Sequence, residues 1–223
     1  MEREIPWGKW NRTKMIFKES KALILQNLLH PAGTMEKGER ETTKNGFLNP
    51  QLSIDQSKLQ NDFIVNFEMV SGEVHLLEEK GSLIEKINEL IQELGAQSVS
   101  FWDTKPLKSL EIASETDLAT ADIGITGADF AIADTGTLVL LSGPKQPRLT
   151  SLLPPVHIAI LEKENIVLNI HALFAKLGES YEKNYDELCT CISFITGPSR
   201  TADIELNLTL GVHGPGRAIV IIV

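Results

Sequence analysis

The chain has 223 residues and a formal net charge of −9, from 30 acidic and 21 basic residues. A net acidic protein repels the phosphates of nucleic acids and the anionic surface of a membrane, so neither is expected as a partner. The longest wholly apolar run, 218–223, is far shorter than the roughly 20 residues that a helix needs to cross a bilayer. Two cysteines in a CxC spacing, with no recognisable signal peptide, favour a cytoplasmic location.

Residues 1–60 are predicted to form a helical extension followed by a polar linker. Apolar residues recur at helical spacing within 12–29, and this amphipathic helix either covers the chain's own core or docks on another subunit. The stretch 31–55 is rich in Gly, Thr, Lys, Glu and Asn, which is typical of a linker. One α/β domain is then expected over 61–223.

From residue 61 onwards, short apolar runs alternate with amphipathic stretches. A helix is predicted over 82–95, with Ser82 as the first residue of a capping box and Gly95 at its end, and another over 169–177. The apolar runs predict strands at 74–77, 98–102, 123–125, 131–133, 137–141, 156–161, 192–195 and 218–223. Such strands are buried on both faces, so we predict an open, mostly parallel sheet with helices on both faces. Ligands of these sheets bind beyond the carboxyl ends of the strands.

The stretch 197–216 combines charged residues with the tightest Gly- and Pro-rich backbone in the sequence. After its opening Gly-Pro pair, Ser199 or Thr201 is predicted to cap a helix that carries Asp203 and Glu205 in its first turn. The unpaired N–H groups of a helix start can bind a phosphate or a carboxylate. We therefore assign Ser199, Thr201 and Asp203 to an anion site. Glu205 is a candidate catalytic base. The alternative is that the acidic residues only stabilise the helix dipole.

Three further residues of this stretch are candidates for the same site. Arg200 can grip a carboxylate through two charge-assisted hydrogen bonds, or it can bridge Asp203 or Asp129 and hold two loops together. His213 lies in the short GVHGPG turn, so its ring is expected at the surface, available for acid–base transfer or anion contact. Gly214, beside it, is assigned to ligand contact.

A second charged cluster occupies 126–148. Asp129 and Asp134 flank a short apolar segment and are candidate catalytic carboxylates, with ordinary turn residues as the alternative. Main-chain N–H groups of the TGT turn can cradle an anion. The residues of this cluster assigned to ligand binding are Thr126, Thr135, Gly136, Thr137 and Arg148. Because parallel strands end at one edge of a sheet, the two clusters are expected to form one crevice, with Arg200 near Asp129, Asp134 or His213.

His157 alternates with apolar residues along a predicted strand, which is typical of a hydrogen-bonded core histidine. The histidines at positions 30, 75 and 171 have no acidic or cysteine partners at metal-ligand spacing, so no metal site is predicted. The sequence contains neither a dinucleotide-binding GxGxxG motif nor a P-loop.

Four ordered sequence blocks resemble the lactate-utilisation (LUD) domain family, of the lactate-utilisation protein C type. They lie within about 122–223 and read AxxGIT with ADxAIADTGT, RLTSLLPPVHIAIL, SFITGPSRTADIE and GVHGPG. The resemblance implies a parallel α/β sheet like that of ribose-5-phosphate isomerases, glucosamine-phosphate deaminases and CoA transferases. It also implies a role in oxidising L-lactate to pyruvate, beside two iron–sulfur proteins.

Ligation of an iron–sulfur cluster by four thiolates within one chain is impossible here, because only Cys189 and Cys191 are present. If the lactate role holds, the clusters therefore belong to partner proteins. No cofactor is predicted for this chain.

Three functions stay open on the sequence. The first is a subunit of a cytoplasmic L-lactate-oxidising system that carries an anion-binding crevice, its own catalysis undecided. The second is a stand-alone isomerase-like or transferase-like enzyme acting on a small phosphorylated or carboxylated metabolite, with Asp129, Asp134 or Glu205 as base. The third is a ligand-sensing or assembly module without chemistry. The expected ligand is a small carboxylate or phosphate, and association with copies of the same chain is left open.

Overall fold

The computed structural model describes residues 55–78, 82–103, 118–183, 189–202 and 208–223. The larger of the chain's two compact units comprises Ser53–Leu173 and Asp186–Val223, and the sheets and the cavity described below belong to it. The helix and most of the linker predicted within 1–60 lie outside the described residues, as do Asp203 and Glu205.

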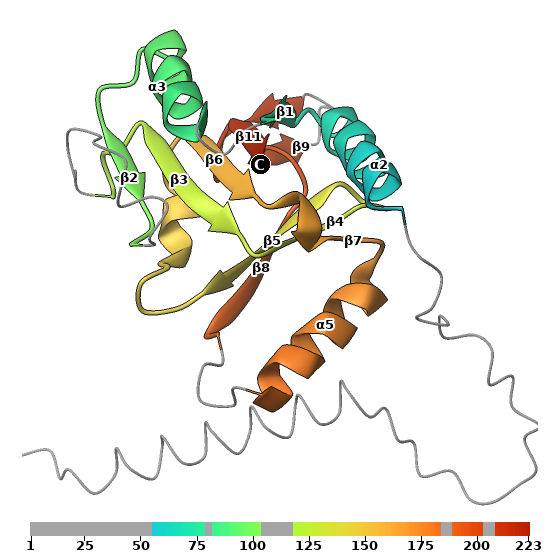
Figure 1. Cartoon of the computed structure of the whole chain (residues 1–223). Coiled ribbons are helices and arrows are strands. Elements are labelled where there is room, and N and C mark those ends of the chain that lie inside the picture. The colour runs from blue at the N-terminus through green and yellow to red at the C-terminus, as the bar shows by residue number, and fades with distance from the viewer. Residues whose placement is uncertain (1–54, 79–81, 104–117, 184–188, 203–207) are drawn as a thin grey trace, which may run out of the picture. The chain divides into compact units, whose positions relative to one another are not determined.

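Figure 1 shows how the described helices and strands follow one another along the chain. The helices are α2 (Gln56–Met69), α3 (Leu83–Glu93) and α5 (Ile170–Lys183), and the 3₁₀ turns are η2 (Arg148–Ser151) and η3 (Lys163–Asn165). The strands are β1 (Glu73–Leu76), β2 (Val99–Phe101), β3 (Ile123–Ala128), β4 (Phe130–Ile132), β5 (Thr137–Ser142), β6 (Val156–Leu161), β7 (Ile166–Val167), β8 (Cys191–Ile195), β9 (Arg200–Ala202), β10 (Leu208–Leu210) and β11 (Arg217–Ile222). Every strand predicted from an apolar run overlaps one of these.

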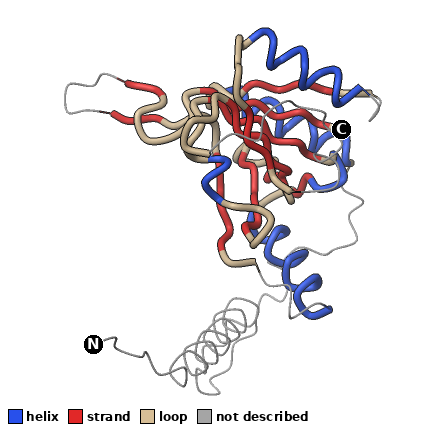
Figure 2. The backbone as a smooth tube through the Cα atoms, turned by 90° about the vertical axis from the view of Figure 1, so that its left-hand side faces the viewer, coloured by secondary structure: helices blue, strands red, loops and turns tan. Residues whose placement is uncertain are grey.

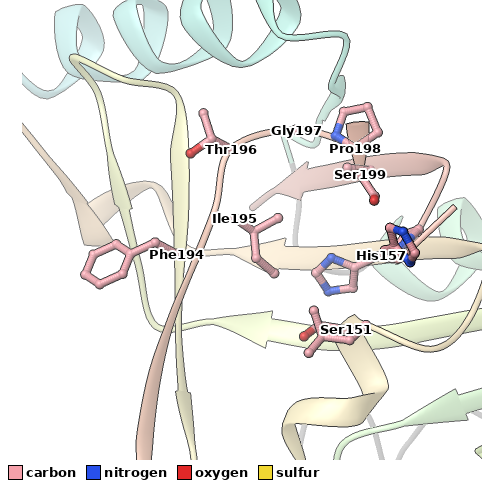
Figure 3. Close-up of a pocket in the computed structure, with 13 residues that line it drawn as sticks. Ser151, His157, Phe194, Ile195, Thr196, Gly197, Pro198 and Ser199 are labelled. Atoms are coloured by element: carbon pink, nitrogen blue, oxygen red, sulfur yellow. The ribbon is translucent and has the colours of Figure 1, made fainter. Parts of the chain in front are cut away.

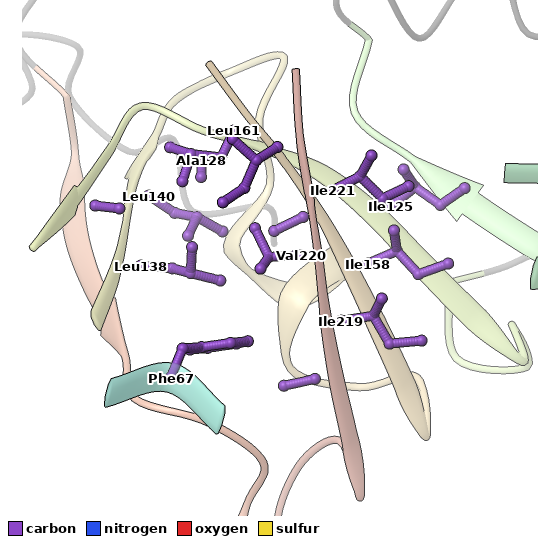
Figure 4. Packing of buried hydrophobic residues seen from close by; sticks show 14 of the residues in the cluster. Phe67, Ile125, Ala128, Leu138, Leu140, Ile158, Leu161, Ile219, Val220 and Ile221 are labelled. Carbon is purple, nitrogen blue, oxygen red and sulfur yellow. The ribbon is translucent and has the colours of Figure 1, made fainter. Parts of the chain in front are cut away.

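Five strands form a parallel sheet in the order β1-β11-β6-β3-β2. Ile219, Ile158 and Ile125 are register partners across its three central strands. Their side chains project from one face of the sheet, while Val220 and Leu161 project from the other (Figure 4). The predicted α/β class with a mostly parallel open sheet is confirmed by this arrangement.

A second sheet, in the order β7-β4-β5-β8, is not part of the sequence prediction. Only four residues separate β4 from β5, so these strands form a hairpin and pair antiparallel. Leu138 and Leu140 of β5 are fully buried and face Val220 and Leu161 of the parallel sheet (Figure 4). The second sheet was missed because an apolar run predicts a buried strand but not the strand with which it pairs.

Helix α2 begins at a side-chain cap, and α3 ends at a glycine. Asp55 caps α2, because its carboxylate accepts a hydrogen bond at 3.0 Å from the main-chain N–H two residues along. Phe63 and Phe67 of α2 are fully buried, and their rings stack with centroids 5.5 Å apart. Gly95 has a φ of +63° and ends α3 as predicted. The capping box is wrong, since the backbone of Ser82 is already helical and its side chain does not cap α3.

The helix predicted after the Gly-Pro pair at 197–198 is also wrong. Strand β9 instead pairs antiparallel with β10, with Thr201 opposite Thr209. The two strands project from the neighbouring sheets (Figure 2). Polar and apolar residues alternate strictly from Thr201 to Leu210, which is a strand pattern rather than a helical one. An anion site here can therefore not rest on the N–H groups of a helix start.

Candidate functional site

A cavity of about 310 Å³ lies at the amino ends of β6 and β11 (Figure 3). One wall consists of the residues that lead into these two strands, and the other consists of the end of β8 with the loop after it. The lining residues are Ser151, Leu152, His157, Phe194, Ile195, Thr196, Gly197, Pro198, Ser199, His213, Gly214, Pro215 and Ala218. Its volume is at the lower end of the range of roughly 300–1,000 Å³ found for small-molecule sites.

This cavity lies at the edge of the parallel sheet opposite to the predicted one. His157 and Ala218 are the second residues of β6 and β11, so the cavity is at the amino edge, whereas the crevice was expected at the carboxyl edge. The prediction treated β8 as a strand of the parallel sheet. Because β8 belongs to the second sheet, the loop that follows it can reach the amino edge.

Three predicted site residues, Ser199, His213 and Gly214, do line the cavity. The N–H of Ser199 donates to the carbonyl of Pro215 at 2.8 Å, and the carbonyl of Ser199 accepts from the N–H of Gly211 at 3.0 Å. These bonds hold the loop after β8 against the GVHGPG turn. A Cβ on Gly214 would lie 3.2 Å from the Cβ of Ser199, so glycine permits the close approach.

His157 is buried and hydrogen-bonded, as predicted, and it also lines the cavity, which was not predicted. Its Nε2 lies 2.9 Å from Oγ1 of Thr126 on the neighbouring strand β3, and its Nδ1 has no partner among the described residues. Burial lowers the pKa of His157 to about 4, so its imidazole is neutral near pH 7. In the view of Figure 3, Ser199 and Ser151 stand above and below this ring. Thr126, assigned to the ligand by sequence, thus contacts His157 behind the cavity.

Asp129 lies where the chain crosses from the parallel sheet to the second sheet, between β3 and β4. Its carboxylate accepts a hydrogen bond from the N–H of Leu141 at 2.7 Å, and its own N–H donates to the carbonyl of Val139 at 3.0 Å. Burial raises the pKa of Asp129 to about 6. Asp134 is exposed, and neither carboxylate is among the described lining residues. The described part of the chain therefore does not place these two acids beside His213.

The TGT turn approaches the cavity through hydroxyl groups. Oγ1 of Thr135 lies 2.8 Å from Oγ1 of Thr137, which lies 2.8 Å from Oγ1 of the lining residue Thr196. Gly136 allows the turn to pack closely on α2, because a Cβ at this position would lie 2.4 Å from the main-chain nitrogen of Phe67. Its φ of +59° also favours glycine. The turn thus docks on α2, and a chain of three hydroxyls leads from it to the cavity.

The three remaining assigned residues do not line the cavity in the described part of the chain. Nη2 of Arg200 donates to the carbonyl of Val70 and, at 3.0 Å, to Oγ of Ser71, both in the turn between α2 and β1. Arg200 thus joins the start of β9 to the turn between α2 and β1, whereas the predicted bridge was to Asp203 or Asp129. Nη1 of Arg148 lies 3.9 Å from Sγ of Cys191, and Thr201 is a residue of β9.

The described lining contains no Asp, Glu, Lys or Arg. Its polar groups are hydroxyls, imidazoles and main-chain amides, set among apolar side chains such as Leu152 and Ile195. Such a lining can hold a small ligand through hydrogen bonds and apolar contact. Among the described residues, no group of three or more His, Cys, Asp or Glu is placed to bind a metal ion. None of the helices that the structure describes has the length and apolar character needed to cross a membrane.

The sequence profile of the LUD domain matches residues 102–223, more than half of the chain, and this range includes every described residue that lines the cavity. The chain belongs to the LUD domain family. This LUD protein is 44% identical over 131 residues to lactate utilization protein C of Halalkalibacterium halodurans, an alignment covering 58% of this chain and 54% of the relative. It is 30% identical over 221 residues to lactate utilization protein C of Shouchella clausii, covering 90% of this chain and 96% of the relative.

The first of these alignments spans about half the length of the relative, and so does a 42% identical match to lactate utilization protein C of a Geobacillus species, which covers 50% of that protein. Among solved structures, the LUD protein is similar to a DUF162 family protein from Deinococcus radiodurans. The TM-score is 0.57 at 20% identity, with 76% of this chain and 98% of the other covered. At this identity the likeness is one of fold, and it agrees with the α/β architecture described above.

Proposed function

We propose that this chain is a component of a cytoplasmic system that oxidises L-lactate to pyruvate. The observation that carries the proposal is the alignment with lactate utilization protein C of Shouchella clausii, which extends over nearly the full length of both chains. The alignments with lactate utilization protein C of Halalkalibacterium halodurans and of the Geobacillus species are 44% and 42% identical and cover 58% and 56% of this chain.

Oxidation of L-lactate to pyruvate releases two electrons and two protons, and the electrons need an acceptor. The sequence has two cysteines, whereas an iron–sulfur cluster is commonly held by four. We therefore assign the electron acceptors to iron–sulfur partner proteins and leave to this chain a role in binding or positioning a carboxylate.

The cavity at the amino edge of the parallel sheet is the site that we assign to this carboxylate. Ser199 and His213 offer side-chain donors to an oxygen atom, and Gly214 lets the GVHGPG turn pack closely against Ser199. The apolar residues Leu152 and Ile195 line the same cavity and can contact the carbon skeleton of a short acid. The isomerase-like alternative finds less support, because it requires a carboxylate base and the described lining contains none.

Growth on L-lactate tests the proposed function in the organism that makes the chain. Deletion of the gene is expected to abolish growth on L-lactate as sole carbon source and to leave growth on glucose unchanged. Expression of the wild-type chain from a plasmid is the control and should restore growth. Undiminished growth of the deletion strain on L-lactate would contradict the proposed function.

A further inference from the structure

The cavity wall at 197–199 is held from outside by the turn between α2 and β1. Arg200 follows this wall directly in the sequence, and its Nη2 donates to the carbonyl of Val70 and to Oγ of Ser71. A Cβ on Gly197 would lie 2.6 Å from the same carbonyl oxygen of Val70, so the wall packs closely on the turn. Two separate contacts therefore join the wall to one turn.

The turn is a firm anchor because α2 fixes it. The N–H of Ser71 donates to the carbonyl of Glu68 at 2.8 Å, and the N–H of Gly72 donates to the carbonyl of Phe67 at 2.9 Å. Phe67 is fully buried in the core. Ser71 has a φ of +65°, a conformation that residues other than glycine seldom adopt unless their surroundings hold it.

We propose that Arg200 is a positioning residue of the cavity. Its hydrogen bonds to Val70 and Ser71, called the latch below, fix the 197–199 wall to the α2–β1 turn and so hold Ser199 in place, while Arg200 itself does not touch the ligand. This inference rests on the proposed ligand site in the cavity. It differs from the anion grip predicted from the sequence, because the acceptors of Arg200 are a carbonyl and a hydroxyl rather than a carboxylate. The LUD profile begins at residue 102, so the latch joins the matched region to a turn that precedes it.

The hydrogen-bond acceptors of Arg200 distinguish a positioning role from direct binding of an anion. A single nitrogen of Arg200 makes both hydrogen bonds, so the planar fork that distinguishes arginine from lysine at a carboxylate is not needed. A lysine ammonium can therefore replace it. The Ser71→Ala substitution removes one acceptor at a site outside the described lining and keeps the Cβ.

Hydrogen exchange measures the latch without any ligand. The amides of Ser199 and Gly211 donate the two bonds that fix the wall, so Arg200→Ala and Ser71→Ala should speed their exchange at least about fivefold, while Arg200→Lys stays within about twofold of wild type. Arg217→Ala is the matched control, because Arg217 pairs with Glu73 instead, and it should leave both amides unchanged. Unchanged exchange at Ser199 in Arg200→Ala and in Ser71→Ala would overturn the latch.

Calorimetric titration with L-lactate, pyruvate and inorganic phosphate completes the test. For a probe that binds the wild-type chain, Arg200→Ala and Ser71→Ala should each weaken affinity about fivefold or more, and Arg200→Lys should restore it to within about twofold. Full affinity in Ser71→Ala with no rescue by lysine would show that Arg200 grips the ligand and would overturn the proposal. If no probe binds the wild-type chain, the proposed ligand site fails, and hydrogen exchange still decides the latch.

Discussion

Burial moves the titration of two side chains in opposite directions. It lowers the pKa of His157 to about 4 and raises the pKa of Asp129 from 3.8 to about 6. The stability contributed by His157 is present above pH 6.5 and is lost as the pH falls towards 4. The stability contributed by Asp129 is complete below pH 3.8 and is lost as the pH rises through 6. Since the two contributions oppose each other between pH 4 and 6, a substitution is needed to separate them.

Asp129→Asn should make the chain more stable near pH 7. The amide removes a buried negative charge, and its oxygen can still accept the hydrogen bond from Leu141. We expect the free energy of unfolding at pH 7 to rise by about 1–3 kcal/mol. The difference in the free energy of unfolding between Asp129→Asn and wild type should shrink as the pH falls from 6 to 4. Urea unfolding across this range measures it, and a constant difference at all pH values would count against the assignment.

Ser199→Ala and His213→Ala should each weaken carboxylate binding while leaving the fold intact, because both residues belong to a loop or turn at the cavity. Loss of one hydrogen bond to a charged ligand costs about 1.5–3 kcal/mol, or roughly 10-fold to 150-fold in Kd. Asp134→Ala is the control, since Asp134 is exposed and is not among the described lining residues. Equal weakening by all three substitutions in calorimetric titrations with L-lactate would rule out a specific contact.

At the scale of elements, the hairpin of β4 and β5 depends on a glycine beside α2. Gly136→Ala places a Cβ 2.4 Å from the main-chain nitrogen of Phe67 and imposes a positive φ on alanine, so we expect a loss of about 2–4 kcal/mol. Gly95→Ala is a matched control, because Gly95 also has a positive φ but nothing within 4 Å of the added Cβ. Its expected loss is about 1 kcal/mol. Melting curves that rank Gly95→Ala as the more damaging change would contradict this packing.

The sequence predicts strands well where apolar runs are continuous. The strand predicted at 156–161 has the bounds observed for β6, and 218–223 is displaced by one residue from β11. Pairing direction was not predictable in this way, because burial alone does not distinguish a parallel neighbour from a hairpin partner. The hairpin of β9 and β10 had a usable signal in the strict alternation from Thr201 to Leu210. The same stretch carries acidic residues, which are also typical of the first turn of a helix, so the two patterns compete here.

The candidate site was predictable only in part. Ser199, His213 and Gly214 were found because Gly- and Pro-rich turns that carry polar side chains are typical of binding loops. His157 was interpreted as a core residue, which is correct, but its place beside the cavity depends on the route of β8 in the second sheet. The use of Arg200 was not predictable, since Val70 and Ser71 are about 130 residues away and carry no motif.

At the scale of the whole molecule, the thiol count constrains how the chain can take part in a redox reaction. With two cysteines in the sequence, the purified chain should be colourless under anaerobic conditions and should contain well under one iron atom per chain. Absorption spectra and iron analysis check this. Stoichiometric iron with a visible charge-transfer band would require ligands other than four thiolates and would contradict the assignment of clusters to partner proteins.

Reconstituted turnover is the measurement that tests the proposed role most directly. The purified chain, its iron–sulfur partners, and the mixture of both would each be given L-lactate and an artificial electron acceptor, with pyruvate as the readout. The account predicts that the mixture forms pyruvate, that the chain alone does not, and that omission of the chain reduces the rate of the mixture. Steady pyruvate formation by the chain alone, or a mixture whose rate does not depend on the chain, would contradict it.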